Sequence, residues 1–351
     1  MDYPKMPSES KSALDRAGRI LAKGTDYIGE AENARLIVAK WRAAHMMPLR
    51  VAADDLKERL ARLSINAFVA LRLKRLFRIR DKLQQSPGMR VTQMQDVGAL
   101  RAVVPSIADV DRLAADYSER PASCLFESSR DDYIRAPKPS GYRSLHITFK
   151  YRATTPSPYD GINLELQVRT QKQHLWASAV EITGLESGAH HKYDKGDPRW
   201  TDFFIASAEL IARHEGGPHS SEYLGLHDNV ISEHVRHFDL EVQAIENYLN
   251  SPKRVPQLEL NATTQYATGN DSVLLRLDLR TGSLVATLYS DRQQAEAVAA
   301  YAAAEAQQSF VNDQMSVVLV SVATPELLRE AYPTFFLDAS GFAKLMLELI
   351  E

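Results

Sequence analysis

The chain has 351 residues, more than one hydrophobic core usually holds, so its length favours two or more domains. Its 42 lysine and arginine residues are matched by 45 aspartate and glutamate residues, and a net charge of −3 excludes a chain that is basic as a whole. Any affinity for phosphate must therefore be local. Cys124 is the only cysteine, which excludes an internal disulfide and a multi-cysteine zinc site and fits the reducing cytoplasm.

The N-terminal part of the chain is predicted to be helical. Residues 1–50 show helical patches interrupted by glycine and proline, without the apolar core of a signal peptide. No stretch reaches the roughly 18 apolar residues of a membrane span, so we expect no membrane partner. From Ala52 to about Gln85 there is no proline or glycine and leucines recur at helical spacing, which predicts one long amphipathic helix.

Strand and helix patterns alternate in the next segment. The apolar run from Ala102 to Val104 predicts a buried strand, and Ser106 is a suitable cap for the helix that follows. Residues 145–151 and 164–168 alternate apolar and polar side chains, so each segment is expected to pack one face and present a polar one. Helical spacing returns from Thr170, near residues 203–211 and from Val230 to Leu249. The pattern is that of an α+β fold.

A second, smaller α+β module is expected at the C-terminus. Residues 251–256 resemble a linker, and two strands at 273–279 and 284–288 flank a Thr281-Gly282 hairpin turn. An alanine-rich helix at 293–308, a strand at 317–322 and helices near Pro325 and Gly341 follow. We therefore predict a helical region at 1–50, a main domain at 51–250 and a module at 256–351, through which the chain would self-associate or bind a regulatory partner.

Cations gather on the predicted long helix. About 100° per residue places Arg75, Arg78 and Lys82 within an arc of roughly 60°, with Arg72 and Lys74 beside them. Several guanidinium forks held by one helix suit bidentate contacts with phosphate oxygens. A solvated face of a surface helix is the competing interpretation.

Two carboxylates are candidates for metal binding. Asp96 precedes the buried strand that carries Arg101, and Glu165 lies on the polar face of another strand beside Gln167 and Arg169. Two carboxylates that face one pocket suit Mg²⁺, or Mn²⁺, completed by water and substrate phosphates. Structural ion pairs with the neighbouring arginines are the alternative.

The segment from Asp132 to His146 is the most unusual in the sequence. Its prolines and its glycine predict a shaped loop that is neither helix nor strand. Lys138, Tyr142, Arg143 and His146 would surround the mouth of this loop, where an aromatic ring between cations could stack on a base and bind its phosphates. An ordinary turn is the alternative.

These motifs together resemble the RelA/SpoT synthetase family, over roughly residues 50–215. The absence of a His-Asp hydrolase domain ahead of them means that alarmone removal is not implied. The resemblance implies a nucleotidyltransferase-like mixed sheet flanked by helices. The motifs that carry it are Arg72-Leu73-Lys74-Arg75 through Lys82, Asp96-Val97-Gly98-Ala99-Leu100-Arg101, Asp132-Tyr133-Ile134, Pro137-Lys138-Pro139-Ser140-Gly141-Tyr142-Arg143-Ser144-Leu145-His146, and Glu165-Leu166-Gln167-Val168-Arg169-Thr170.

The resemblance also implies an activity: an ATP:GTP 3′-diphosphotransferase that moves the β,γ-pyrophosphate of ATP to the ribose 3′-hydroxyl of GDP or GTP, as in the stringent response. Asp96 and Glu165 would hold the metal, with Arg101 completing the catalytic set. Arg78 stands where many members carry serine and adds a cation to the ATP site. The ATP site would comprise Arg72, Lys74, Arg75, Arg78, Lys82 and Arg101, and the acceptor site Lys138, Tyr142, Arg143, His146, Gln167 and Arg169.

Two alternatives share this site. Some small proteins with this layout act as toxins on the 3′ end of tRNA, restrained by an attached module. That function needs basic surface outside the pocket, where the sequence offers only Lys192, Arg199 and Arg213. The other alternative is a catalytically silent nucleotide-binding regulator, which the presence of both Asp96 and Glu165 disfavours.

Overall fold

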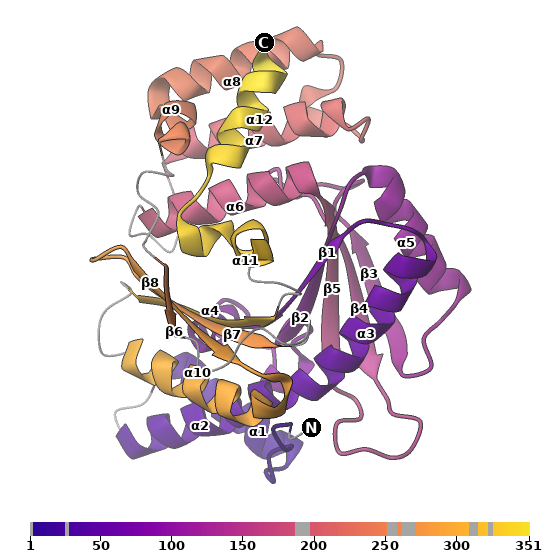
Figure 1. The fold of residues 1–351 in the computed structure, drawn as a ribbon, viewed down its shortest axis with the longest axis vertical. Coiled ribbons are helices and arrows are strands. Elements are labelled where there is room, and N and C mark those ends of the chain that lie inside the picture. The colour runs from indigo at the N-terminus through magenta and orange to yellow at the C-terminus, as the bar shows by residue number, and fades with distance from the viewer. Residues whose placement is uncertain are drawn as a thin grey trace.

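The chain folds around one large sheet. The structure, a computed structural model, describes residues 3–24, 28–186, 197–250, 258–261, 271–308, 315–321 and 326–351. Within these ranges nine strands pair in the order β3-β4-β5-β2-β1-β9-β7-β8-β6, with helices on both sides (Figure 1). The strands are β1 (Phe68–Leu73), β2 (Gly98–Val104), β3 (Leu125–Asp132), β4 (Leu145–Tyr151), β5 (Asn163–Thr170), β6 (Leu258–Asn261), β7 (Ser272–Asp278), β8 (Ser283–Tyr289) and β9 (Met315–Ser321).

The sheet is mixed, because β2 runs parallel to β5 and β6 parallel to β8 while the other neighbouring strands are antiparallel. The predicted α+β class is therefore confirmed. The alternation in residues 145–151 and 164–168 correctly located β4 and β5, and the hairpin of β7 and β8 turns through Thr281-Gly282 as expected. The predicted cap is also present, since Ser106 accepts a hydrogen bond from the backbone N–H of Asp109.

One long helix from Ala52 to Gln85 was a wrong prediction. The segment forms α3 (Met46–Arg62), β1 and α4 (Leu76–Gln85). The chain leaves α3 through Ser64, whose φ of 53° is left-handed. In β1 the side chains of Leu71 and Leu73 are buried and Arg72 between them is less so. This period of two was hidden because leucine and arginine suit a helix equally well.

A single helix from Val230 to Leu249 was also wrong. Gln243, in the left-handed conformation with φ 51°, separates α8 (Asp228–Val242) from α9 (Ala244–Leu249). The edge strand β3 and the short β6 were not predicted from the sequence. β3 is largely exposed along its length, so it lacks the apolar alternation by which strands are recognised.

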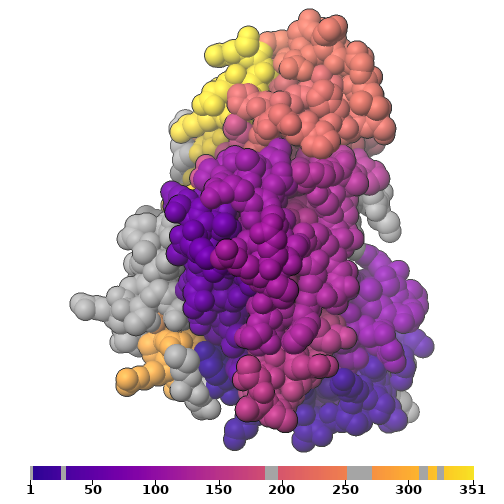
Figure 2. All heavy atoms as spheres, turned by 90° about the vertical axis from the view of Figure 1, so that its right-hand side faces the viewer, coloured from indigo at the N-terminus to yellow at the C-terminus, as the bar shows by residue number. Residues whose placement is uncertain are grey.

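Some helices pack on the sheet, and others form a bundle beyond one end of it. The helices α3 and α5 (Ile107–Glu119) pack on its apolar face, where Leu56 and Leu113 join the core of the strands. Beyond one end of the sheet, α6 (Gln171–Glu186) continues into a bundle with α7 (Pro198–His214), α8, α9 and α12 (Ser340–Ile350), at the top of Figure 1. In the side view of Figure 2, α12, in yellow, lies against this bundle, and indigo N-terminal residues lie at the opposite end. Among the described helices, none has the length and hydropathy to cross a membrane.

The C-terminal strands extend the sheet of the main domain. Two residue pairs, Leu71 with Ser321 and Arg72 with Val320, join β1 to β9, whereas β9 and β7 share six. The helix α10 (Gln294–Gln308) adds a buried ion pair of 2.6 Å between Glu305 and Arg42. The predicted linker at 251–256 lies outside the described residues. The predicted domain boundaries, and self-association or partner binding through the module, stay predictions.

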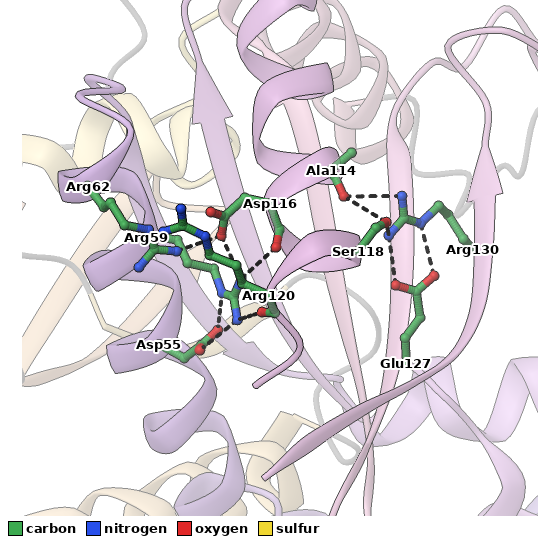
Figure 3. Close-up of polar contacts among 9 residues, drawn as sticks. All are labelled: Asp55, Arg59, Arg62, Ala114, Asp116, Ser118, Arg120, Glu127 and Arg130. Carbon is green, nitrogen blue, oxygen red and sulfur yellow. Dashed lines mark hydrogen bonds and ion pairs between the residues drawn. The ribbon is translucent and has the colours of Figure 1, made fainter. Parts of the chain in front are cut away.

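A buried polar network joins α3 to α5 on the side away from the site (Figure 3). The guanidinium of Arg59 donates to Asp55, at 2.8 Å, and to Asp116, at 2.6 Å, and lies 4.1 Å from the centre of the Tyr117 ring. Burial alone would raise the pKa of Asp116, but hydrogen bonds from Arg62 and Arg59 hold this pKa below its usual value. Charged Asp116 therefore stabilises the contact of the two helices.

We expect Asp116→Asn to lower the free energy of unfolding by about 1–3 kcal/mol at pH 7, because the arginines lose their charged acceptor. A depressed carboxyl pKa stabilises the fold above the unfolded-state pKa of about 4, and this contribution disappears as the pH falls through the folded pKa. Urea unfolding from pH 7 to pH 3 should show wild type and variant converging at the acid end. A gap that stays constant would rule out the ionised carboxylate as its source.

Candidate active site

Four neighbouring strands bring most of the predicted site residues to one face of the sheet. In the register of β1, β2, β5 and β4, Arg72 lies level with Glu165, and Arg101 lies level with Gln167 and His146. Arg169 follows one step further along β5. Residues paired across strands project to the same side, so these side chains share one face.

Asp96 is held by two lysines rather than by an arginine. Lys74 lies 2.5 Å and Lys82 2.9 Å from its two carboxylate oxygens. Burial raises the pKa of Asp96, but the two ammonium groups outweigh that effect and lower the pKa below its usual value. A structural pair with Arg101, one of the alternatives from the sequence, is not what the structure contains. Asp96 is therefore ionised and lies between two cations.

Glu165 is the centre of a second hydrogen-bonded group. His146 Nδ1 lies 3.2 Å from one carboxylate oxygen, and Gln167 Nε2 donates to the other at 2.5 Å. Tyr142 Oη lies 2.9 Å from His146 Nε2. A carboxylate only accepts, so the consistent arrangement has His146 Nδ1–H donating to Glu165 and Nε2 accepting from the tyrosine. Burial raises the pKa of Glu165, while His146 has the larger opposing effect and the net shift is downward.

The loop from Asp132 to His146 forms an aromatic and cationic wall next to Glu165. Lys138 Nζ lies 4.3 Å from the centre of the Tyr133 ring and 5.4 Å from that of Tyr142. Tyr133, Tyr142 and His146 contact each other edge to face. Gly141 needs its φ of 83°, and a Cβ there would lie 2.9 Å from Ala208 of α7. The prediction of a shaped loop is therefore correct for residues 133–144, whereas Asp132 is the last residue of β3 and His146 belongs to β4.

Arg143 differs from its neighbours in this loop. Its guanidinium donates to the backbone oxygens of Ile134 and Pro218, at 2.9 and 2.8 Å, and to the Glu209 carboxylate at 3.1 Å. These bonds anchor the loop to α7, and the side chain is 4% exposed. We therefore assign Arg143 to anchoring the loop, not to direct acceptor contact.

Three arginines on the shared face, Arg72, Arg101 and Arg169, have few anionic neighbours. Arg169 is 3% exposed and its Nε has no hydrogen-bond partner in the described structure. Burial, followed by the charge of Arg101, lowers the pKa of Arg169 well below its usual value. Burial, followed by the charge of Arg72, also lowers the pKa of Arg101. Buried guanidinium groups with unused donors are suited to contact with an anion.

The remaining two predicted cations lie at the start of α4. Arg75 precedes the helix, and its Nη2 lies 3.9 Å from Glu181 of α6. Arg78 lies on the helix, 36% exposed and 3.8 Å from Asp81, at the rim of the site. Arg75, Arg78 and Lys82 are thus near each other, but Arg72 and Lys74 belong to β1 and the residue after it, not to a helix.

Some residues of the site were not singled out from the sequence. Tyr133 is part of the loop wall, and its neighbours in the Asp132-Tyr133-Ile134 motif were the only available signal. The sequence also could not show which groups Glu330, Tyr332 and Thr334 contact, because each partner is more than 150 residues away.

The thin basic patch considered for tRNA is largely neutralised. Arg199 binds Asp197 at 2.5 Å, and Arg213 contacts Glu209 at 3.1 Å and Asp228 at 2.8 Å. Lys192 lies outside the described residues. The described part of this surface therefore gives tRNA binding little support.

The two carboxylates have the donor chemistry of a site for Mg²⁺. Oxygen ligands on a polar face suit this ion, and each carboxylate is ionised. In the described residues no group of three or more His, Cys, Asp or Glu side chains is arranged to hold a metal by itself. Phosphate oxygens of a substrate would have to complete the coordination.

Comparisons with known proteins agree on one family. Residues 71–196 match the model described as the region found in RelA / SpoT proteins. The chain is 27% identical over 165 residues to GTP pyrophosphokinase YjbM of Bacillus subtilis (strain 168), covering 44% of this chain and 74% of that protein. It is 28% identical over 163 residues to probable GTP diphosphokinase RSH2, chloroplastic, of Arabidopsis thaliana, covering 45% of this chain and only 20% of that protein.

A solved structure is also similar. The small alarmone synthetase 1 from Bacillus subtilis, bound to its product pppGpp, matches 49% of this chain and 91% of its own, with 22% identity and a TM-score of 0.41.

We expect Arg143→Met to destabilise the fold by about 3 kcal/mol or more, because it breaks a buried ion pair. Arg135→Met is the matched control in the same loop: Arg135 is 50% exposed and pairs with Asp111 and Asp132, so its loss should cost less than about 1 kcal/mol. Denaturant unfolding measures both. Equal effects in the two variants would contradict the anchoring role of Arg143.

Proposed function

We propose that the chain is a GTP pyrophosphokinase, because its residues 71–196 match the model of the region found in RelA / SpoT proteins. It would transfer the β,γ-pyrophosphate of ATP to the ribose 3′-hydroxyl of GDP or GTP and release AMP. The observation that carries the proposal is a pair of ionised carboxylates near the arginines of the shared face: Asp96 is held by Lys74 and Lys82, and Glu165 by His146 and Gln167. The matched relatives bear the names GTP pyrophosphokinase and GTP diphosphokinase.

The geometry supports a division of the site into two ends. The ATP end comprises Arg72, Arg75 and Arg101 with the lysines beside Asp96. The acceptor end comprises Lys138, Tyr142, His146, Gln167 and Arg169, with the tyrosine ring available to stack on a base. Asp96 and Glu165 would hold Mg²⁺, or Mn²⁺, which neutralises charge on the phosphate oxygens when bound.

The transfer needs no covalent intermediate on the protein. The acceptor 3′-oxygen bonds to the β-phosphorus, and the bond from that phosphorus to the α,β-bridging oxygen breaks, so AMP leaves with this oxygen. Glu165 is the candidate to take the 3′-hydroxyl proton, because it is ionised and His146 and Gln167 fix both its oxygens. Lys74, Lys82 and the arginines stabilise charge on the pyrophosphate, which is the main task in such transfers.

Replacement of either carboxylate is expected to stop the reaction. Asp96→Asn and Glu165→Gln keep the shape of each side chain and remove its charge, so AMP release from ATP and GDP should fall by at least about 1,000-fold in each, as expected when a preorganised charge contact is lost. Chromatography of nucleotide products measures the loss, and circular dichroism checks folding. Lys344→Gln, which neutralises an exposed charge on α12 in the helical bundle, is the control that should leave turnover unchanged.

The acceptor is tested by a direct competition of substrates. The purified chain with γ-labelled ATP and Mg²⁺ is given GDP, GTP, AMP or bulk tRNA in separate reactions, and the label is followed. We expect label on GDP or GTP. Label on tRNA alone would establish the toxin-type alternative, and label on no acceptor with either Mg²⁺ or Mn²⁺ would favour the silent regulator.

A further inference from the structure

A segment of the C-terminal module reaches three arginines of the site through intermediate groups. This segment, residues 330–335, is called the C-terminal clamp. It joins α11 (Glu326–Ala331) to the short helix η6 (Pro333–Phe336), and it packs against β1 and α6. In Figure 1, α11 is seen next to α6. The side chains of Tyr332, Thr334 and Phe335 are buried.

The first two contacts act on Arg75 and Arg72. Thr334 Oγ1 donates to Glu181 Oε2 at 3.2 Å, and the other oxygen of Glu181 lies 3.9 Å from Arg75. The Phe335 ring centre is 5.3 Å from the same guanidinium. Tyr332 Oη donates to the backbone oxygen of Leu71 at 2.9 Å, next to Arg72 in β1.

The third contact acts on Arg169 through His174. The His174 Nε2 lies 2.8 Å from the backbone oxygen of Glu330, and its Nδ1 is hydrogen-bonded to Arg169 Nη2. Burial, followed by the charges of Arg169 and Arg101, lowers the pKa of His174 far below its usual value, so the ring is neutral. A neutral ring that donates from Nε2 accepts at Nδ1, which is what the guanidinium requires.

We propose that the C-terminal clamp positions Arg75 and Arg72 of the ATP site, so that the C-terminal module sets the affinity for ATP. Its contact with His174 acts instead on Arg169, at the acceptor end. This inference rests on the proposed function. A guanidinium binds phosphate through a planar fork, and its orientation therefore matters as much as its charge. The clamp residues are positioning residues, because they contact Arg75, Arg72 and Arg169 or their immediate neighbours and not the reacting atoms.

The test uses Thr334→Val in the full chain. Valine keeps the shape of threonine and removes the hydroxyl that holds Glu181. Calorimetry with α,β-methylene ATP and Mg²⁺ should give a Kd about three- to tenfold higher than for wild type, the range of one lost hydrogen bond. In turnover, KM for ATP should rise while kcat and the acceptor KM stay unchanged. Phe335→Leu, which keeps an apolar side chain but removes the ring beside Arg75, should weaken binding in the same direction.

Two controls separate positioning from packing. Thr334→Ser retains the hydroxyl and should restore wild-type affinity. Thr287→Val makes the same substitution on β8, within the module but away from the clamp, and should have no effect. A Thr334→Val variant that binds as well as wild type, or more tightly, overturns the inference alone. Failure of the wild-type chain to bind the analogue overturns the proposed function, and the inference with it.

Discussion

The burial of guanidinium groups on one face of a sheet, with few carboxylates to balance them, is the constraint on which the site depends. Arg169 is 3% exposed, and the positive charge of Arg101 repels its guanidinium and lowers its pKa further. A cation removed from water is unfavourable unless an anion or fixed hydrogen bonds replace the lost hydration. The described part of this face meets that need only partly, since the Nε atoms of Arg101 and Arg169 have no hydrogen-bond partner there.

Asp96 and Glu165 do not pair with Arg101 or Arg169, because other side chains hold both carboxylates. Asp96 is bound by Lys74 and Lys82, and Glu165 by His146 and Gln167. Each therefore stays ionised without forming a buried pair with Arg101 or Arg169. The same strands make this separation possible, since their other face supplies leucines and valines to the core under α3 and α5. A shift of one residue in the pairing of β2 with β5 would exchange the two faces and remove the site.

The sequence was sufficient for the parts of the fold with a strong local pattern. The alternation that defines β4 and β5 placed His146, Glu165 and Gln167 on polar faces, and the prolines and glycine predicted the loop beside Glu165. The sequence was insufficient where the residues suit a helix and a strand equally well. This is the case for β1, for which a helix was predicted although Arg72 projects from a strand. It also could not show that Arg143 turns back toward Glu209, because that partner is 66 residues away.

Contacts at long sequence separation also explain why the sequence could not show how the C-terminal module is joined to the site. The strand β9 joins β1 through only two residue pairs, and the clamp lies further along the chain, at residues 330–335. The polar groups of the clamp contact Glu181, His174 and the backbone of β1, and the ring of Phe335 lies over the guanidinium of Arg75. For Arg169 this arrangement is physically reasonable: a carboxylate in the place of His174 would neutralise the guanidinium, whereas a neutral imidazole restricts its orientation and leaves its charge available. Arg75 does face a carboxylate, Glu181 at 3.9 Å, and Thr334 holds the other oxygen of that carboxylate while the Phe335 ring lies over the guanidinium.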